Sequence, residues 1–142
     1  MTRSVLSAAA LTGLVLCGAC SLLREPYPKR HVDLYSYAVV TKGGLYDPGR
    51  LVSFTAVKTA SPGNSRLAGD RFTDFLGVAD FSFGYELEYN DEKSQFLEGV
   101  RVVATVEYNG TYYADTVSVI APFFYYTGPH TTDTLRIALP AD

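Results

Sequence analysis

The pattern of hydrophobic and polar residues between Gly99 and Pro122 predicts a long antiparallel hairpin. Its first arm alternates, with one apolar face made of Val100, Val102, Ala104, Val106 and Tyr108. Asn109-Gly110 follows, and alternation resumes from Thr111 to Ile120. A period of two residues is typical of a half-buried strand, and Asn-Gly suits the two positive φ angles of a type I′ turn.

Four shorter segments carry the same alternation. Residues 32–41 and 51–59 predict two strands, separated by Gly- and Pro-containing turns around Leu45-Tyr46. Residues 77–89 and 134–139 predict two more strands. The expected inward residues are Val52, Phe54 and Ala56 in the second segment, Ala79, Phe81, Phe83, Tyr85, Leu87 and Tyr89 in the third, and Leu135, Ile137 and Leu139 in the last.

The remaining segments are less regular. Residues 60–70 combine Pro, Gly, Asn and Ser without a period and predict a loop, whereas residues 71–75 predict a short strand with Phe72 inward. Residues 90–95 and 123–133 read as connections, the second a loop or bulged segment. About seven short strands with no helical period after residue 20 predict one all-β domain, a two-sheet antiparallel sandwich.

The amino end predicts a secretory signal. Met1-Thr2-Arg3 is positively charged and Val5 to Ala19 is small and apolar, as in signal peptides. Leu16-Cys17-Gly18-Ala19-Cys20 resembles the lipobox of bacterial lipoproteins, although Cys17 replaces the usual Leu or Val. The resemblance implies that Cys20 is diacylated and becomes the new amino terminus. The alternative is an ordinary signal peptide cut near Ala19, which would leave a soluble secreted domain.

The predicted organisation therefore has three parts. Residues 1–19 are a lipoprotein signal peptide, residues 20–30 are the lipidated cysteine and a tether containing Pro26 and Pro28, and residues 31–142 are the β-sandwich domain. The expected location is the bacterial cell envelope, anchored by lipid in the outer membrane, so the membrane is the first predicted partner.

Two segments resemble a known family of modules. VVTKGGLYDPGRLVSFTA and RFTDFLGVADFSF, which lie within residues 39–83, are similar to carboxypeptidase-regulatory-like and related transthyretin-like or Ig-like modules. The shared T-D-x-x-G-x-A-x-F positions are Thr73, Asp74, Gly77, Ala79 and Phe81. In that family these positions make turns and fill the core. The resemblance implies an Ig-like or transthyretin-like sandwich with a binding or spacer role, and it supplies no catalytic residue.

Net charge and the positions of cysteine and histidine argue against several classes of function. The formal net charge is −3, so the domain lacks the basic footprint of a nucleic-acid-binding protein. Both cysteines, Cys17 and Cys20, precede the domain. His31 and His130 stand in proline- or charge-rich connections, where we expect exposed imidazoles, and their spacing favours no metal site. We therefore predict no catalytic residue, no cofactor and no metal.

Two remaining features are candidates for binding. Acidic residues gather between Asp80 and Glu98; we expect a solvated face, and cation binding there stays open. Four consecutive aromatic residues and a nearby histidine form a possible contact surface, unless the run crosses between the sheets: Phe123, Phe124, Tyr125, Tyr126 and His130.

The function predicted from the sequence is a non-catalytic, lipid-anchored binding or scaffolding domain of the envelope with a protein or glycan partner. The alternative is a carbohydrate-binding accessory module that uses Phe123–His130. A hydrolase using the carboxylates of residues 80–98 is the third hypothesis.

Overall fold

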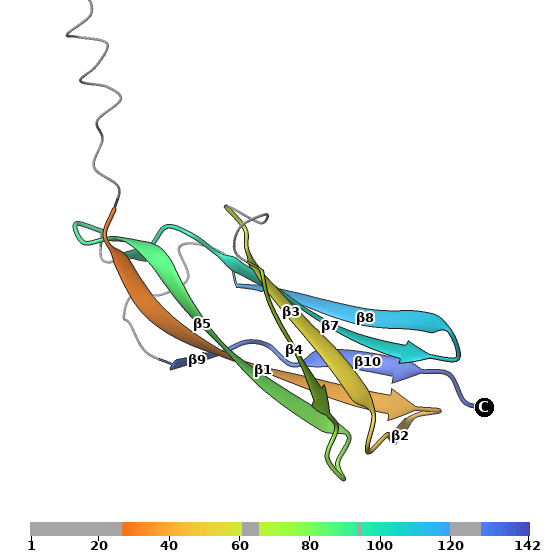
Figure 1. Cartoon of the computed structure of the whole chain (residues 1–142). Helices are drawn as coiled ribbons and strands as arrows, with labels where there is room; N and C mark the ends of the chain where they lie inside the picture. Colours follow the sequence, from red (N-terminus) through yellow and green to blue (C-terminus); the bar gives the residue numbers. More distant parts are fainter. Residues whose placement is uncertain (1–26, 61–65, 94, 120–128) are drawn as a thin grey trace, which may run out of the picture.

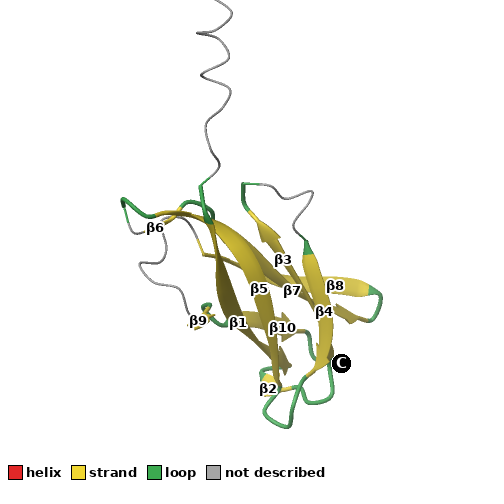
Figure 2. Cartoon of the chain, turned by 60° about the vertical axis from the view of Figure 1, so that its left-hand side comes forward, coloured by secondary structure: helices red, strands yellow, loops and turns green. Residues whose placement is uncertain are grey.

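Two β-sheets face each other in the computed structural model, which describes residues 27–60, 66–93, 95–119 and 129–142 (Figures 1 and 2). One sheet has the order β10-β1-β5-β6, with β2 and β9 also paired to β1, and the other has the order β4-β3-β7-β8. Within these ranges there is no helix that could cross a membrane. The predicted all-β sandwich is confirmed.

Seven of the strands in the described ranges have five residues or more, as the sequence pattern predicts. They are β1 (Lys29–Lys42), β3 (Leu51–Lys58), β4 (Leu67–Phe72), β5 (Val78–Asn90), β7 (Val100–Tyr108), β8 (Thr111–Val119) and β10 (Leu135–Leu139). The short strands are β2 (Leu45–Tyr46), β6 (Gln95–Phe96) and β9 (Pro129–Thr131). Most neighbours are antiparallel, but β10 and β9 pair with β1 in parallel.

The predicted hairpin is present in β7 and β8. Their register runs from Tyr108↔Thr111 to Val100↔Val119. Asn109 and Gly110 have φ angles of 51° and 74°, which is the sign pattern of a type I′ turn. All five expected inward residues of β7 are buried.

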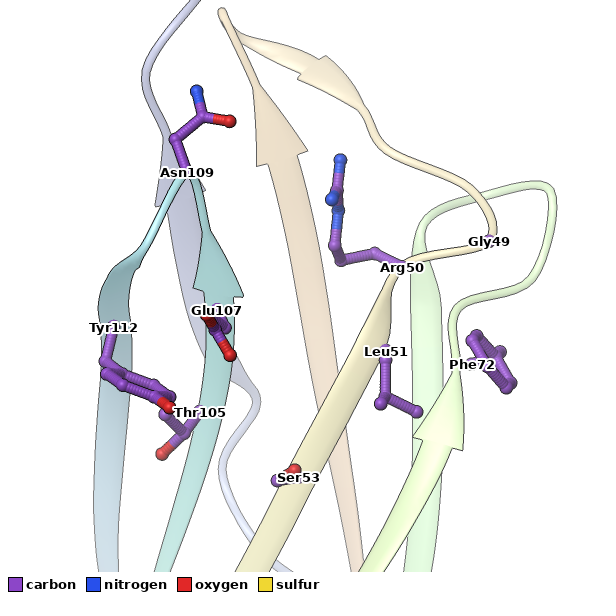
Figure 3. A pocket seen from close by; sticks show the side chains of 9 residues that line it. All are labelled: Gly49, Arg50, Leu51, Ser53, Phe72, Thr105, Glu107, Asn109 and Tyr112. Atoms are coloured by element: carbon purple, nitrogen blue, oxygen red, sulfur yellow. The ribbon is translucent and has the colours of Figure 1, made fainter.

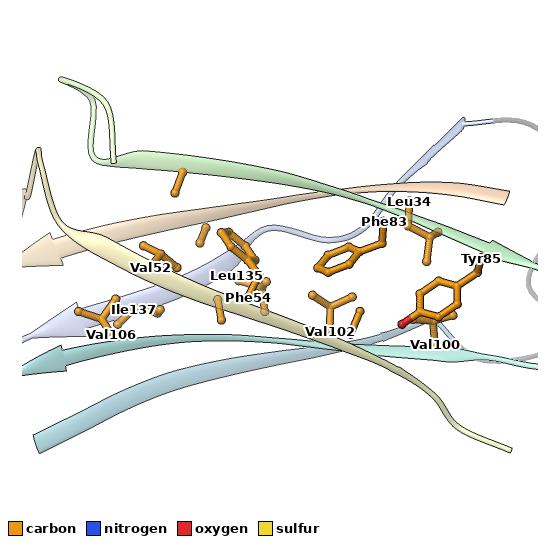
Figure 4. Close-up of a cluster of buried hydrophobic side chains, with 14 of the residues drawn as sticks. Leu34, Val52, Phe54, Phe83, Tyr85, Val100, Val102, Val106, Leu135 and Ile137 are labelled. Atoms are coloured by element: carbon orange, nitrogen blue, oxygen red, sulfur yellow. The ribbon is translucent and has the colours of Figure 1, made fainter. Parts of the chain in front are cut away.

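The core lies between the sheets, where the two sets of inward residues meet (Figure 4). Phe54 of β3 stacks against Phe81 of β5, with ring centroids 5.8 Å apart, and Phe83 packs beside Phe81 at 4.7 Å. The inward residues predicted for β3, β5 and β10 are buried, except that Phe81 is only partly so. Removal of these side chains from water is the main stabilising contribution of such a sandwich.

Each side of the sandwich is closed by a hydrogen bond between a strand of one sheet and a strand of the other. Asp115 of β8 points inward and its carboxylate accepts a hydrogen bond from the backbone N–H of Arg136 on β10 at 2.7 Å. On the other side Tyr85 of β5 hydrogen-bonds to the backbone of Leu67 on β4, and burial raises the pKa of its phenol to about 12. These contacts occupy polar groups at the edges of the sheets.

Strand β4 corrects two expectations. Leu67 to Asp70 are strand rather than loop, and residues 61–65 lie outside the described ranges. Phe72 is 69% exposed, not inward. The register pairs Phe72 with Leu51 and Gly69 with Phe54, so Gly69 takes the inward side. A Cβ atom on Gly69 would lie 2.2 Å from the Phe81 ring; the missing side chain gives that ring its space.

The first strand begins slightly before its predicted start at residue 32. Lys29 and Arg30 already belong to β1 and pair with Glu88 and Leu87 of β5. The Arg30 guanidinium lies 2.5 Å from the Asp91 carboxylate and 4.1 Å above the centre of the Tyr89 ring. The predicted signal peptide, Cys20 and the predicted tether as far as residue 26 lie outside the described residues.

Candidate functional site

A groove of about 580 Å³ lies on the outer face of the β4-β3-β7-β8 sheet (Figure 3). We call it the β3–β7 groove. Its lining residues are Gly49, Arg50, Leu51, Ser53, Phe72, Thr105, Glu107, Asn109 and Tyr112. Its volume falls within the range of small-ligand sites, about 300–1,000 Å³.

The groove forms where β3 and β7 stop pairing. Their register ends at Ser53↔Thr105, although β3 extends to Leu51 and β7 to Tyr108. The two strands separate beyond that pair, as Figure 3 shows. The gap in the ladder leaves an opening bordered by the segment before β3 and by the hairpin turn.

Two aromatic side chains stand on either side of the groove. Phe72 belongs to β4 and Tyr112 to β8, the two edge strands of the sheet. They are 69% and 70% exposed. Phe72 pairs with Leu51 and Tyr112 pairs with Glu107, so each ring shares the outer face with its cross-strand neighbour.

Polar side chains lie between the rings. Ser53 and Thr105 are directly opposite each other on β3 and β7 and each offers a hydroxyl that donates and accepts. Glu107 adds an exposed carboxylate and Asn109 an amide at the turn. The groove therefore combines apolar walls with a hydrogen-bonding floor.

A buried threonine holds the segment that precedes β3. The Thr73 hydroxyl donates to the Asp47 carbonyl at 2.7 Å and accepts from the Arg50 backbone N–H at 2.8 Å. The Arg50 side chain in turn donates from Nε to the Asp47 carboxylate at 2.8 Å. Thr73 belongs to the T-D-x-x-G-x-A-x-F segment, and it keeps one border of the groove in place.

A charged network lies beneath that border. The Tyr108 hydroxyl donates to the Asp142 carboxylate, and Lys42 Nζ lies 2.5 Å from the same carboxylate. The hydrogen bond from Lys42, followed by that from Tyr108, lowers the pKa of Asp142. Arg50 lies above the Tyr108 ring at 5.1 Å. The network ties β1, β7 and the carboxyl end together under the groove.

The most exposed large hydrophobic side chains of the described residues gather at this end of the sandwich. We call it the distal end, because it lies opposite the start of β1 at Lys29 (Figure 1). Phe75, in the turn between β4 and β5, is 82% exposed. The set that defines the distal end is Leu45, Tyr46, Phe72, Phe75 and Tyr112.

His31 is exposed, as expected, but it contacts two acids that the sequence spacing does not reveal. Its Nδ1 lies 2.9 Å from Glu86 and its Nε2 lies 3.0 Å from Asp33. Hydrogen bonds that the imidazole donates to the Asp33 carboxylate and then to the Glu86 carboxylate raise the pKa of His31. The carboxylates occupy opposite ring nitrogens, and no group of three or more His, Cys, Asp or Glu in the described ranges could hold a metal ion.

The remaining predicted site residues are His130 and the aromatic residues 123–126. His130 is half-buried on β9, opposite Leu34 of β1, rather than exposed. The aromatic run of residues 123–126 lies outside the described residues, so its role as a contact surface stays a prediction. The structure thus brings neither His130 nor His31 into the β3–β7 groove.

The acidic stretch is only partly the solvated face that we expect. Glu86 is exposed, but Glu98 is buried. The Glu98 carboxylate accepts the backbone N–H of Glu88 at 2.9 Å and lies 3.6 Å from Lys58 Nζ. This buried acid therefore supports the β5 backbone and has a basic partner.

The sequence pattern does not identify the groove as a site, although it does indicate the position of one of its residues. A two-residue turn at Asn109-Gly110 fixes the pairing of Tyr112 with Glu107, on the face opposite the core. Tyr112 is therefore readable from the hairpin as an outward aromatic residue. No comparable pattern in the sequence indicates that Phe72 faces outward.

Comparison of the chain with models of protein families and with curated proteins finds no match. The resemblances to bacterial lipoproteins and to carboxypeptidase-regulatory-like modules stay predictions from sequence segments.

Proposed function

We propose that this protein is a non-catalytic, lipid-anchored domain of the bacterial cell envelope that binds an envelope component through its distal end. The observation that carries the proposal is the concentration of exposed aromatic and aliphatic side chains at that end. Exposed hydrophobic groups that gather in one region mark interaction sites, whereas scattered ones need no explanation.

The position of the distal end supports the proposal. Strand β1 has 14 residues, which at ~3.3 Å per residue span about 45 Å. A lipid on Cys20 would hold the Lys29 end of β1 towards the bilayer and present the distal end away from it. The exposed rings would then point away from the membrane that carries the anchor, towards the other components of the envelope.

The chemistry of the groove supports binding rather than hydrolysis. Glycoside hydrolysis uses a pair of carboxyl groups, but Glu107 is the single acid among the described residues that line the groove. The acids of residues 80–98 do not line it, and Glu86 and Asp91 contact His31 and Arg30. The third hypothesis, a hydrolase based on that stretch, gains no support from this arrangement.

The test is co-sedimentation of the full chain, purified in detergent, with lipid-depleted envelopes of the native bacterium. We expect the wild type to sediment with the envelopes and the double variant Phe72→Ala/Phe75→Ala to lose at least 80% of the bound fraction. The matched control is Tyr35→Ala/Tyr37→Ala, which removes two exposed rings from β1, on the other sheet. No binding by the wild type, or equal losses in both variants, would overturn the proposal.

A further inference from the structure

The walls of the β3–β7 groove are suited to a ligand with flat apolar faces. Phe72 and Tyr112 come from opposite edges of the sheet, and both rings are exposed. An aromatic ring buries large apolar area with little loss of conformational freedom, and tyrosine adds a hydrogen-bonding tip. The C–H faces of a sugar ring can stack on such surfaces.

The floor is suited to a ligand rich in hydroxyl groups. Ser53 and Thr105 supply hydroxyls, and Glu107 supplies acceptor oxygens, all from adjacent positions of β3 and β7. Asn109 offers both donors and acceptors. Few ligands other than sugars carry apolar ring faces and many hydroxyl groups in the same unit.

The local charge favours a neutral ligand. Within the described part of the chain, Arg50 is the one basic residue that lines the groove, and its Nε donates to Asp47. Glu107 carries a negative charge nearby, and the formal net charge of the chain is −3. A polyanionic glycan would meet no excess of positive charge here.

The same geometry disfavours a peptide. A peptide that extends a sheet pairs along the backbone of an edge strand, whereas β3 and β7 are the central strands of their sheet, and their ladder is open only in the short stretch beyond Ser53↔Thr105. An amphipathic helix needs a continuous apolar groove, and Ser53, Thr105 and Glu107 interrupt the apolar lining. A proline-rich peptide, which also uses aromatic rings, is a separate arm of the test.

We propose that the β3–β7 groove binds a neutral oligosaccharide chain, with Phe72 and Tyr112 stacking on sugar rings and Glu107 accepting hydrogen bonds from sugar hydroxyls. This inference rests on the proposed function and names the class of its ligand. It differs from the sequence-based alternative, because it uses the outer face of the β4-β3-β7-β8 sheet instead of residues 123–130.

The experiment is isothermal titration of the full chain in a detergent without a sugar head group. The neutral probes are chitohexaose, cellohexaose, maltohexaose, mannohexaose and xylohexaose, with polygalacturonate and a proline-rich decapeptide as contrasting probes. We expect at least one neutral hexasaccharide to bind. We expect Tyr112→Ala to weaken that binding at least tenfold and Tyr112→Phe, which keeps the ring, to weaken it less than threefold.

Controls separate loss of stacking from loss of folding. Tyr112 is 70% exposed, so Tyr112→Ala should keep the wild-type melting temperature within a few degrees, and Tyr35→Ala on the other sheet should keep wild-type affinity. If no neutral hexasaccharide binds, or if Tyr112→Ala binds as well as the wild type, the inference is wrong. Tyr112-dependent binding of polygalacturonate or the decapeptide alone would also overturn it.

These outcomes are distinguishable from failure of the proposed function. Envelope binding that depends on Phe72 and Phe75, without binding of any hexasaccharide, would retain the proposed function and exclude a neutral glycan as its ligand.

Discussion

Gly110 occupies a backbone conformation that a side chain with a branched β-carbon rarely adopts. Its φ is 74°, and nothing lies within 4 Å of the position that a Cβ would take. Gly110→Val should therefore lower the free energy of unfolding by at least ~1 kcal/mol through backbone strain, without a clash. Urea titration measures this loss. Gly110→Asn should lose less, because Asn tolerates positive φ, and an unchanged midpoint for the valine variant would contradict the type I′ turn.

His31 should make stability depend on pH. Asp33 and Glu86 raise the pKa of its imidazole above the ordinary 6.5. Because the folded-state pKa is the higher one, this contribution to stability is fully present below the unfolded-state pKa. It is lost as the pH rises through the folded-state pKa. The imidazole is exposed, so the effect is small.

NMR titration of the His31 ring measures that pKa directly. The melting temperature of the wild type should fall slightly over this pH window, and the fall should be reduced in His31→Gln, which does not titrate. An NMR pKa at or below 6.5 would show that the two carboxylates do not stabilise the charged ring.

At the scale of elements, alternation identifies the strands but not all of their neighbours. The inward residues of β3, β5, β7 and β10 follow directly from the pattern, because each strand has one buried face. The parallel pairing of β10 with β1 does not, since alternation carries no information on strand direction. The sequence could thus predict the sandwich and its core, but not its complete topology.

Strand β4 shows why the sequence does not predict the wall of the groove that Phe72 forms. Its burial does not alternate, and most of its residues are exposed. Only the register with β3 determines that Gly69 faces the core and Phe72 faces solvent. Tyr112, in contrast, follows from the Asn-Gly turn. The outward position of Tyr112 can therefore be predicted from the sequence. The outward position of Phe72 depends on how Gly69 packs against Phe81, which the sequence pattern does not show.

The contact between β4 and β5 gives a prediction of its own. A Cβ on Gly69 would lie 2.2 Å from the Phe81 ring, and Phe54, Phe83 and Arg71 surround that ring. Gly69→Ala should therefore destabilise the domain by ~1–3 kcal/mol through overpacking. Chemical denaturation of Gly69→Ala, Phe81→Leu and the double variant measures the coupling. The smaller leucine should relieve part of the clash, so additive losses would argue against this contact.

At the scale of the whole molecule, the fold separates the predicted anchor from the candidate binding site. The described chain enters at Tyr27 and reaches β1 at Lys29. The segment before β3 and the β7–β8 turn, which border the β3–β7 groove, lie at the opposite, distal end, where β1 ends (Figure 1). An extended tether from Cys20 to Pro28 would add up to about 28 Å at ~3.1 Å per residue. An anchored domain could then reach envelope components well outside the headgroup region.

The groove is held away from the membrane in this way only if Cys20 carries the lipid. A substitution of Cys20 tests whether it does. Cys20→Ser should move the protein from the membrane fraction to the soluble fraction, because two or three acyl chains supply the binding energy that a polar tether lacks. Cys17→Ser is the matched control: it removes the other cysteine of Leu16-Cys17-Gly18-Ala19-Cys20 and should stay in the membrane fraction. Fractionation with immunoblotting, and mass measurement of the mature amino terminus, report both outcomes. If Cys20→Ser remains in the membrane pellet while its signal is cleaved, the anchor lies elsewhere, and the groove is not presented by a lipid on this cysteine.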